Sequence, residues 1–295
     1  MLNQPTRVIA LEEAFSIPAD RALQPPPAPW RAAQQGDTQA RLNHDVQAEL
    51  LDLGKSRIAA MDAAGVDFQV LSLTAPGPQS YDARTAVAIA REVNDAAHAA
   101  VLAHPERFAA FAAIPTPDVS ASVREFERCV GLGFKGALIN AHTHGEFLDE
   151  EKYWPILECA ESLDVPIYIH PGFPPPGVMH AYFRGYEELA RAPWGFSIDT
   201  GMHFLRMVFG GVFDRFPKLR IILGHLGEGI PFVLQRIHHH TLPAMGRRGL
   251  KRTPIEYIRE HMIVTSSGNF SIPALQCTVA ELGIDGRRFE ATLGH

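Results

Sequence analysis

Short apolar runs that end in a polar residue constrain the fold of this chain most. Residues 165–170 and 219–225 are rich in isoleucine and end in His170 and His225, and a run near the start ends in Glu12 and Glu13. A continuous apolar run between turn signals is typical of a strand buried on both faces, as in parallel sheets covered by helices. In a (β/α)8 barrel, the carboxyl ends of such strands converge on one point. The three polar ends therefore predict a metal site.

Helix-like segments separate the apolar runs along the whole chain. We expect helices at 57–64, 86–104, 121–132, 153–163, 190–213, 254–261 and 273–282. We expect strands at 7–13, 68–73, 108–114, 136–140, 165–170, 219–225 and 262–265, with 288–293 as the remaining candidate for an eighth. This alternation predicts parallel strands joined by right-handed crossovers, and closing such a sheet normally takes eight.

Length and charge favour one enzyme-sized domain. The 295 residues fit a single α/β barrel covering 1–295, and the proline-rich part of 19–56 predicts a long active-site loop. The net charge is −6 and the sequence contains no long run of charges of one sign, so a nucleic-acid partner is not expected. Neither a secretory signal nor a membrane-spanning stretch is evident, so we expect a cytoplasmic protein with a small-molecule substrate.

Five short strings stand out in order along the chain. They are Ala10-Leu-Glu-Glu-Ala-Phe15, Ile139-Asn-Ala-His-Thr-His-Gly145, Ile167-Tyr-Ile-His-Pro171, Leu223-Gly-His-Leu-Gly-Glu-Gly229 and Thr265-Ser-Ser-Gly-Asn269. Together they resemble the amidohydrolase-related decarboxylases, which include γ-resorcylate, 2,3-dihydroxybenzoate and aminocarboxymuconate semialdehyde decarboxylases. The resemblance extends from Val8 to about Asp285. It implies a distorted (β/α)8 TIM barrel that binds one divalent metal ion, zinc or manganese.

The resemblance also implies roles in metal binding and proton transfer. Glu12 and His170 match metal ligands of the family. His225 matches a histidine beside the metal, with Glu228 as its partner, and direct ligation by His225 stays open. From the residues alone, a histidine at a buried strand end is more often a hydrogen-bonded core residue, and Glu228 could cap the helix that opens at Gly229.

Further residues are expected at the substrate. By resemblance, Asn140 and Arg236 match positions that approach the substrate, and Phe15 is expected to shape the same site. His142 and His144 imitate a metal-binding His-x-His pair, but they follow a mid-chain strand, so we interpret them as part of a loop that faces the pocket. Family members are commonly dimers or tetramers, which implies a homodimer or homotetramer here.

The sequence departs from the family near its carboxyl end. Relatives continue past the Gly283 region with a strand whose aspartate binds the metal, and in an ungapped comparison Thr292 stands in that place. The comparison predicts that the last strand and the C-terminal helices are truncated or altered and that the aspartate ligand is lost.

The chemistry favoured by these residues is non-oxidative decarboxylation of a small hydroxylated aromatic acid. A divalent ion would position the substrate carboxylate and neutralise charge, while the histidine delivers a proton to the ring carbon. The same ion could instead lower the pKa of a bound water, so a hydrolase of a cyclic ester or amide is the main alternative. An impaired enzyme or an inactive truncated family member is the third possibility.

Overall fold

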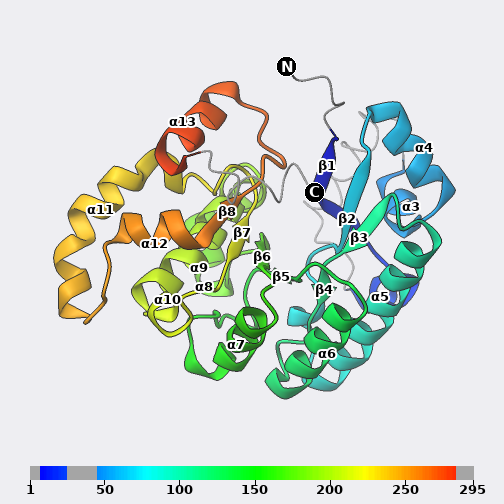
Figure 1. Ribbon diagram of the computed structural model, residues 1–295, viewed down its shortest axis with the longest axis horizontal. Coiled ribbons are helices and arrows are strands. Elements are labelled where there is room, and N and C mark those ends of the chain that lie inside the picture. Colours follow the sequence, from blue (N-terminus) through cyan, green and yellow to red (C-terminus); the bar gives the residue numbers. More distant parts are fainter. Residues whose placement is uncertain (1–6, 25–44, 284–295) are drawn as a thin grey trace.

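The fold is a curved layer of parallel strands with helices around its outside (Figure 1). The computed structural model describes residues 7–24 and 45–283. Its strands are β1 (Ile9–Phe15), β2 (Phe68–Leu73), β3 (Phe108–Ala110), β4 (Ala112–Ala113), β5 (Ala137–Asn140), β6 (Ile167–His170), β7 (Ile221–Leu223) and β8 (Met262–Val264). They pair in parallel in the orders β1-β2-β3 and β4-β5-β6-β7-β8. This architecture confirms the predicted α/β barrel.

One expected strand is divided into two. The run 108–114 forms β3, which pairs with β2, and β4, which pairs with β5, and Phe111 separates them. Its backbone N–H still donates to the carbonyl of Leu71, so the two short sheets continue into one another. The candidate eighth strand at 288–293, including Thr292, lies outside the described residues.

Helices follow most strands and cover their outer face. They are α1 (Pro18–Leu23), α3 (Val46–Leu51), α4 (Lys55–Ala64), α5 (Ala83–Ala103), α6 (Val119–Gly131), α7 (Trp154–Ser162), α8 (Pro176–Phe183), α9 (Gly195–Phe209), α10 (Val212–Arg215), α11 (Ile230–Arg247), α12 (Pro254–His261) and α13 (Ile272–Leu282). Short 3-10 turns lie at η1 (Pro78–Ser80), η2 (Glu151–Tyr153) and η3 (Glu187–Ala190). The helix expected at 190–213 is divided because Gly211 adopts a left-handed backbone.

The segment expected as a loop, 19–56, is partly helical. It contains most of α1, all of α3 and the first residues of α4, while 25–44 lie outside the described residues. Asp45 begins α3 because its carboxylate accepts hydrogen bonds from the N–H groups of Gln47 and Ala48. The described parts of the segment therefore contain short helices, and its role as an active-site loop stays a prediction.

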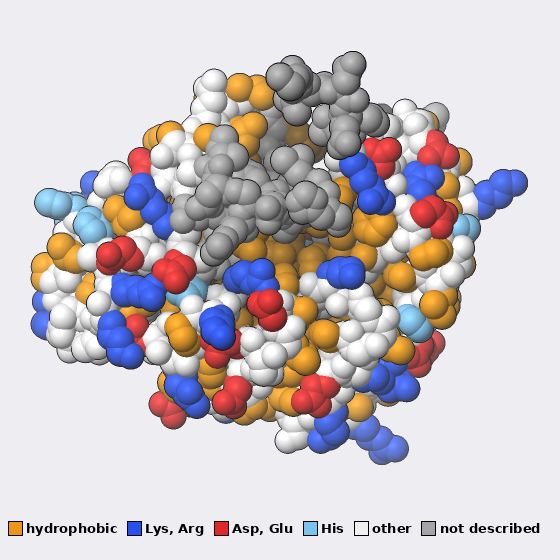
Figure 2. All heavy atoms as spheres, viewed as in Figure 1, with side chains coloured by type: hydrophobic (Ala, Val, Ile, Leu, Met, Phe, Trp, Pro, Cys, Tyr) orange, Lys and Arg blue, Asp and Glu red, His pale blue; other side chains and the backbone are white. Residues whose placement is uncertain are grey.

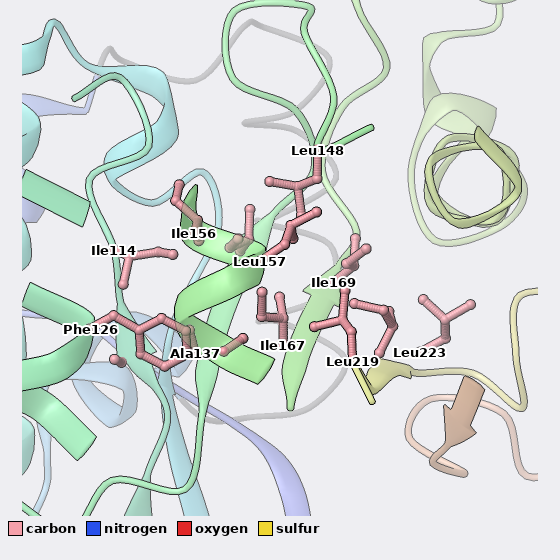
Figure 3. Close-up of a cluster of buried hydrophobic side chains, with 14 of the residues drawn as sticks. Ile114, Phe126, Ala137, Leu148, Ile156, Leu157, Ile167, Ile169, Leu219 and Leu223 are labelled. Carbon is pink, nitrogen blue, oxygen red and sulfur yellow. The ribbon is translucent and has the colours of Figure 1, made fainter. Parts of the chain in front are cut away.

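The apolar core has an inner and an outer part. The inner cluster takes about one side chain from each strand: Leu11, Val70, Ala109, Phe111, Leu138, Tyr168, Ile222 and Ile263. The outer cluster lies between strands and helices, and Figure 3 shows Ile167 and Ile169 of β6 beside Ile156 and Leu157 of α7. Because side chains alternate along a strand, a residue two positions after an inner one also faces the interior, at the carboxyl end.

A β-bulge in β1 decides which acidic residue enters the barrel. Ala10 pairs with Gln69 and Glu13 with Leu71, so Leu11 and Glu12 together lie opposite Val70. Without the bulge, alternation from Leu11 would turn Glu13 and Phe15 inward. With it, Glu12 takes the inward direction and the later residues of β1 are shifted by one.

The described surface carries both signs of charge. Lys, Arg, Asp and Glu side chains are interspersed over the face in Figure 2, rather than gathered by sign. Across residues 7–24 and 45–283, none of the helices combines the length and apolar character needed to cross a membrane.

Candidate functional site

The Glu12 carboxylate is the meeting point of the three polar strand ends. Its Oε1 lies 3.4 Å from His170 Nε2 and 3.5 Å from His225 Nε2. His170 follows Tyr168 by two positions on β6, and His225 follows β7, so both belong to the carboxyl end of the barrel. The structure therefore brings together Glu12, His170 and His225, although up to 213 residues separate them in the sequence.

A strained turn presents His225 together with Glu228. His225, Leu226 and Glu228 have φ values of 53°, 60° and 56°, and the glycines at 227 and 229 are also left-handed. Each such non-glycine residue costs on the order of 1 kcal/mol, and strain of this kind clusters at functional sites. The turn places His225 Nδ1 2.7 Å from Glu228 Oε1, which leaves Nε2 directed toward Glu12.

Burial and opposite charge act against each other on these groups. Burial raises the pKa of Glu12, but hydrogen bonds and charge from His170 and His225 outweigh it and hold the pKa well below its usual range. Burial lowers the pKa of His225, but the carboxylates of Glu12 and Glu228 outweigh it and raise the pKa to about 10. The two carboxylates therefore favour the protonated form of the His225 imidazole.

A cavity of about 560 Å³ opens beside His170. Its wall includes Asn140, whose buried amide donates to the Leu73 carbonyl at 3.3 Å. His142 and His144 also lie on the wall, which confirms the predicted pocket-facing loop. A second cavity of about 390 Å³ has His225 in its wall.

Two of the predicted substrate residues do not reach the cavity wall in this chain. Phe15 has no exposed surface and packs in the outer core, because the β1 bulge turns its side chain away from the interior. Arg236 is exposed on α11, where the neighbouring Leu234 takes the buried face. A substrate contact by Phe15 is therefore not supported, and one by Arg236 stays a prediction.

Three residues of the site were not predicted from the sequence. Tyr168 donates its hydroxyl hydrogen to Glu12 Oε2 from inside the barrel. Gly224 follows β7, where a Cβ atom would lie 2.6 Å from that same oxygen. Arg191 adds a guanidinium to the wall of the larger cavity. The alternation of β6 gives the one available signal, since it places Tyr168 two positions before His170 on the same face.

The donor set fits a divalent ion. A carboxylate and an imidazole, as in Glu12 and His170, are ligands that zinc and manganese accept, and two ligands of a tetrahedral ion with bonds of about 2.1 Å stand about 3.4 Å apart. The separation of Glu12 Oε1 and His170 Nε2 matches that spacing. Within the described part of the chain, no set of three or more His, Cys, Asp or Glu side chains forms a complete metal site. Further ligands would have to come from elsewhere.

Comparisons with known proteins give the same picture. The amidohydrolase family model matches residues 20–285. γ-Resorcylate decarboxylase of Rhizobium sp. (strain MTP-10005) is 38% identical over 292 residues, which cover 94% of this chain and 84% of that protein.

Solved structures agree with the sequence comparison. A 2,6-dihydroxybenzoate decarboxylase complexed with 2,6-dihydroxybenzoate matches with a TM-score of 0.83 and 36% identity, over 95% of this chain and 85% of that one. A dihydroxybenzoic acid decarboxylase from Polaromonas sp. JS666, with bound manganese and the inhibitor 2-nitroresorcinol, matches with a TM-score of 0.83 and 35% identity, over 95% and 84%. The chain therefore belongs to the amidohydrolase family, as these similarities show together with the barrel and its centre of glutamate and histidine.

Proposed function

We propose that this protein is a metal-dependent, non-oxidative decarboxylase of a small hydroxylated aromatic acid. The observation that carries the proposal is the convergence of Glu12, His170 and His225, where His170 lines a cavity of about 560 Å³ and His225 lines one of about 390 Å³. The substrates and names of the similar proteins support the substrate class. Glu12 and His170 would hold one divalent ion, manganese or zinc, and His225 with Glu228 would move the proton.

Glu12 and His170 would hold the ion, which would supply positive charge for binding an anionic substrate. The reaction then needs a proton at the ring carbon that carries the carboxylate. His225 donates it from Nε2, the new C–H bond forms, and the C–C bond to the carboxylate breaks as carbon dioxide leaves. The electrons of that bond restore the aromatic ring, and His225 regains a proton from water.

Glu228 makes this proton transfer possible through its hydrogen bond with Nδ1 of His225. The contact fixes the ring orientation and stabilises the imidazolium before donation. Asn140 is buried on the cavity wall, from which its side chain would contact a substrate hydroxyl. Arg191 on the same wall favours an anionic ligand because a guanidinium keeps its charge.

The test combines metal analysis with product detection. Purified protein loaded with Mn²⁺ or Zn²⁺ is offered a panel of dihydroxybenzoates, and released carbon dioxide and the phenolic product are measured. We expect one bound ion per chain and release of carbon dioxide from at least one acid. His170→Asn should abolish both, whereas the matched control His180→Asn, on the exposed part of α8, should leave both unchanged.

The outcomes separate the candidate functions. Metal binding without carbon dioxide from any acid would contradict the decarboxylase and favour hydrolysis of a cyclic ester or amide. Absence of both metal and turnover would contradict both enzymatic functions. The cytoplasmic location and the homodimer or homotetramer stay predictions.

A further inference from the structure

Tyr168 is a polar side chain in the otherwise apolar inner cluster of the barrel. Its side chain has no exposed surface, and its ring lies 5.9 Å from that of Phe111, centroid to centroid. Its hydroxyl hydrogen bonds with Glu12 Oε2 and lies 3.2 Å from Thr265 Oγ1. A buried phenol oxygen needs such partners, since leaving it unpaired costs about 1–3 kcal/mol.

The direction of these hydrogen bonds follows from the charge of Glu12. An ionised carboxylate can only accept, so the Tyr168 hydroxyl donates to Oε2. That hydroxyl therefore accepts from Thr265, and Thr265 in turn accepts from Ser267 Oγ at 2.6 Å. The chain of hydroxyls is thus polarised from Ser267 toward Glu12, and each bond strengthens the next.

The two oxygens of Glu12 consequently have different surroundings. Oε2 is occupied by Tyr168, while Oε1 faces the imidazole nitrogens of His170 and His225. We propose that Tyr168 is a positioning residue that fixes the Glu12 carboxylate so that Oε1 alone is presented to the divalent ion. The inference rests on the proposed function, since it concerns the same ion.

The experiment is a metal titration of the whole chain carrying Tyr168→Phe. Phenylalanine keeps the ring packing and removes the donor, so we expect Mn²⁺ to bind about 10- to 100-fold more weakly, as loss of a partner behind a metal ligand usually does. We also expect a changed electron paramagnetic resonance spectrum of bound Mn²⁺, because the carboxylate is then free to rotate. A substitution that merely loosened the fold would not change that spectrum at saturating metal.

Tyr257→Phe is the matched control. Tyr257 is also buried and also donates to a carboxylate, that of Asp214, but it belongs to α12. Its loss should lower the melting temperature and leave Mn²⁺ affinity unchanged. Should Tyr168→Phe fold poorly, Thr265→Val tests the same chain of hydroxyls from its next member, with an expected loss of about twofold to fivefold.

The possible results distinguish this inference from the proposed function. Wild-type affinity and an unchanged spectrum in Tyr168→Phe would overturn the positioning role while leaving the decarboxylase standing. Equal losses in Tyr168→Phe and Tyr257→Phe would overturn it too, because they would indicate a general effect of buried tyrosine hydroxyls. Wild-type protein that binds Mn²⁺ but releases no carbon dioxide refutes the decarboxylase and leaves the metal titration valid. A wild-type chain that binds no divalent ion would refute both.

Discussion

Replacing Gly224 by alanine should displace the Glu12 carboxylate, which we propose as a metal ligand. The added Cβ would lie 2.6 Å from Glu12 Oε2 and 2.8 Å from Tyr168 Oη, whereas an ordinary contact is about 3.4 Å. The Tyr168 ring is fully buried and packed, so the carboxylate has to move by roughly 0.8 Å. Ligand positions need to be held within about 0.5 Å. We therefore expect Gly224→Ala to bind Mn²⁺ at least tenfold more weakly.

The same crowding should also destabilise the metal-free protein. Inserting a methyl group into a packed interior typically costs about 1–3 kcal/mol of unfolding free energy. Mn²⁺ titration and thermal melts of the chelator-treated protein measure the two effects. Gly246→Ala is the control, because a Cβ there meets nothing within 4 Å and alanine favours the α11 helix. Wild-type Mn²⁺ affinity in Gly224→Ala would refute the steric reasoning.

Three further changes probe proton placement and the core. Burial raises the pKa of Asp199 from 3.8 to about 7, so protonated Asp199 is favoured on folding and stability falls as pH rises from about 4 to 7. Asp199→Asn should thus raise the unfolding free energy at pH 8 by up to about 4 kcal/mol, which a thermal melt would detect as a higher melting temperature, and should have no such effect at pH 4. An equal effect at both pH values would contradict this reasoning. Glu228→Gln weakens the support of the His225 imidazolium and should lower kcat about 10- to 100-fold with little change in KM; an unchanged kcat would contradict the proton-transfer role. Asn94→Ala removes the two hydrogen bonds that the Asn94 side chain makes with the Ala113 N–H and carbonyl, at 2.9 and 2.8 Å. Urea denaturation should therefore show an unfolding free energy lower by about 2–4 kcal/mol. A decrease below about 0.5 kcal/mol would contradict this expectation.

Local patterns in the sequence determined the order of elements and part of the site. The predicted strand 68–73 is β2, and the predicted strands 165–170 and 219–225 contain β6 and β7, which pair with each other. These features are readable because burial on both faces imposes a continuous apolar run wherever a parallel strand forms. The three-residue spacing of His225 and Glu228 likewise keeps their pairing local.

Tertiary pairing decided which side chains share the centre. The bulge that turns Glu12 inward and Phe15 outward arises from the register of β1 against β2, more than fifty residues away, and leaves no mark in the β1 sequence itself. The contact of Tyr168 with Glu12 spans 156 positions. Such contacts depend on how the barrel closes in space, so they cannot be predicted from neighbouring residues in the sequence. The periodicity of burial, in contrast, is visible along the chain.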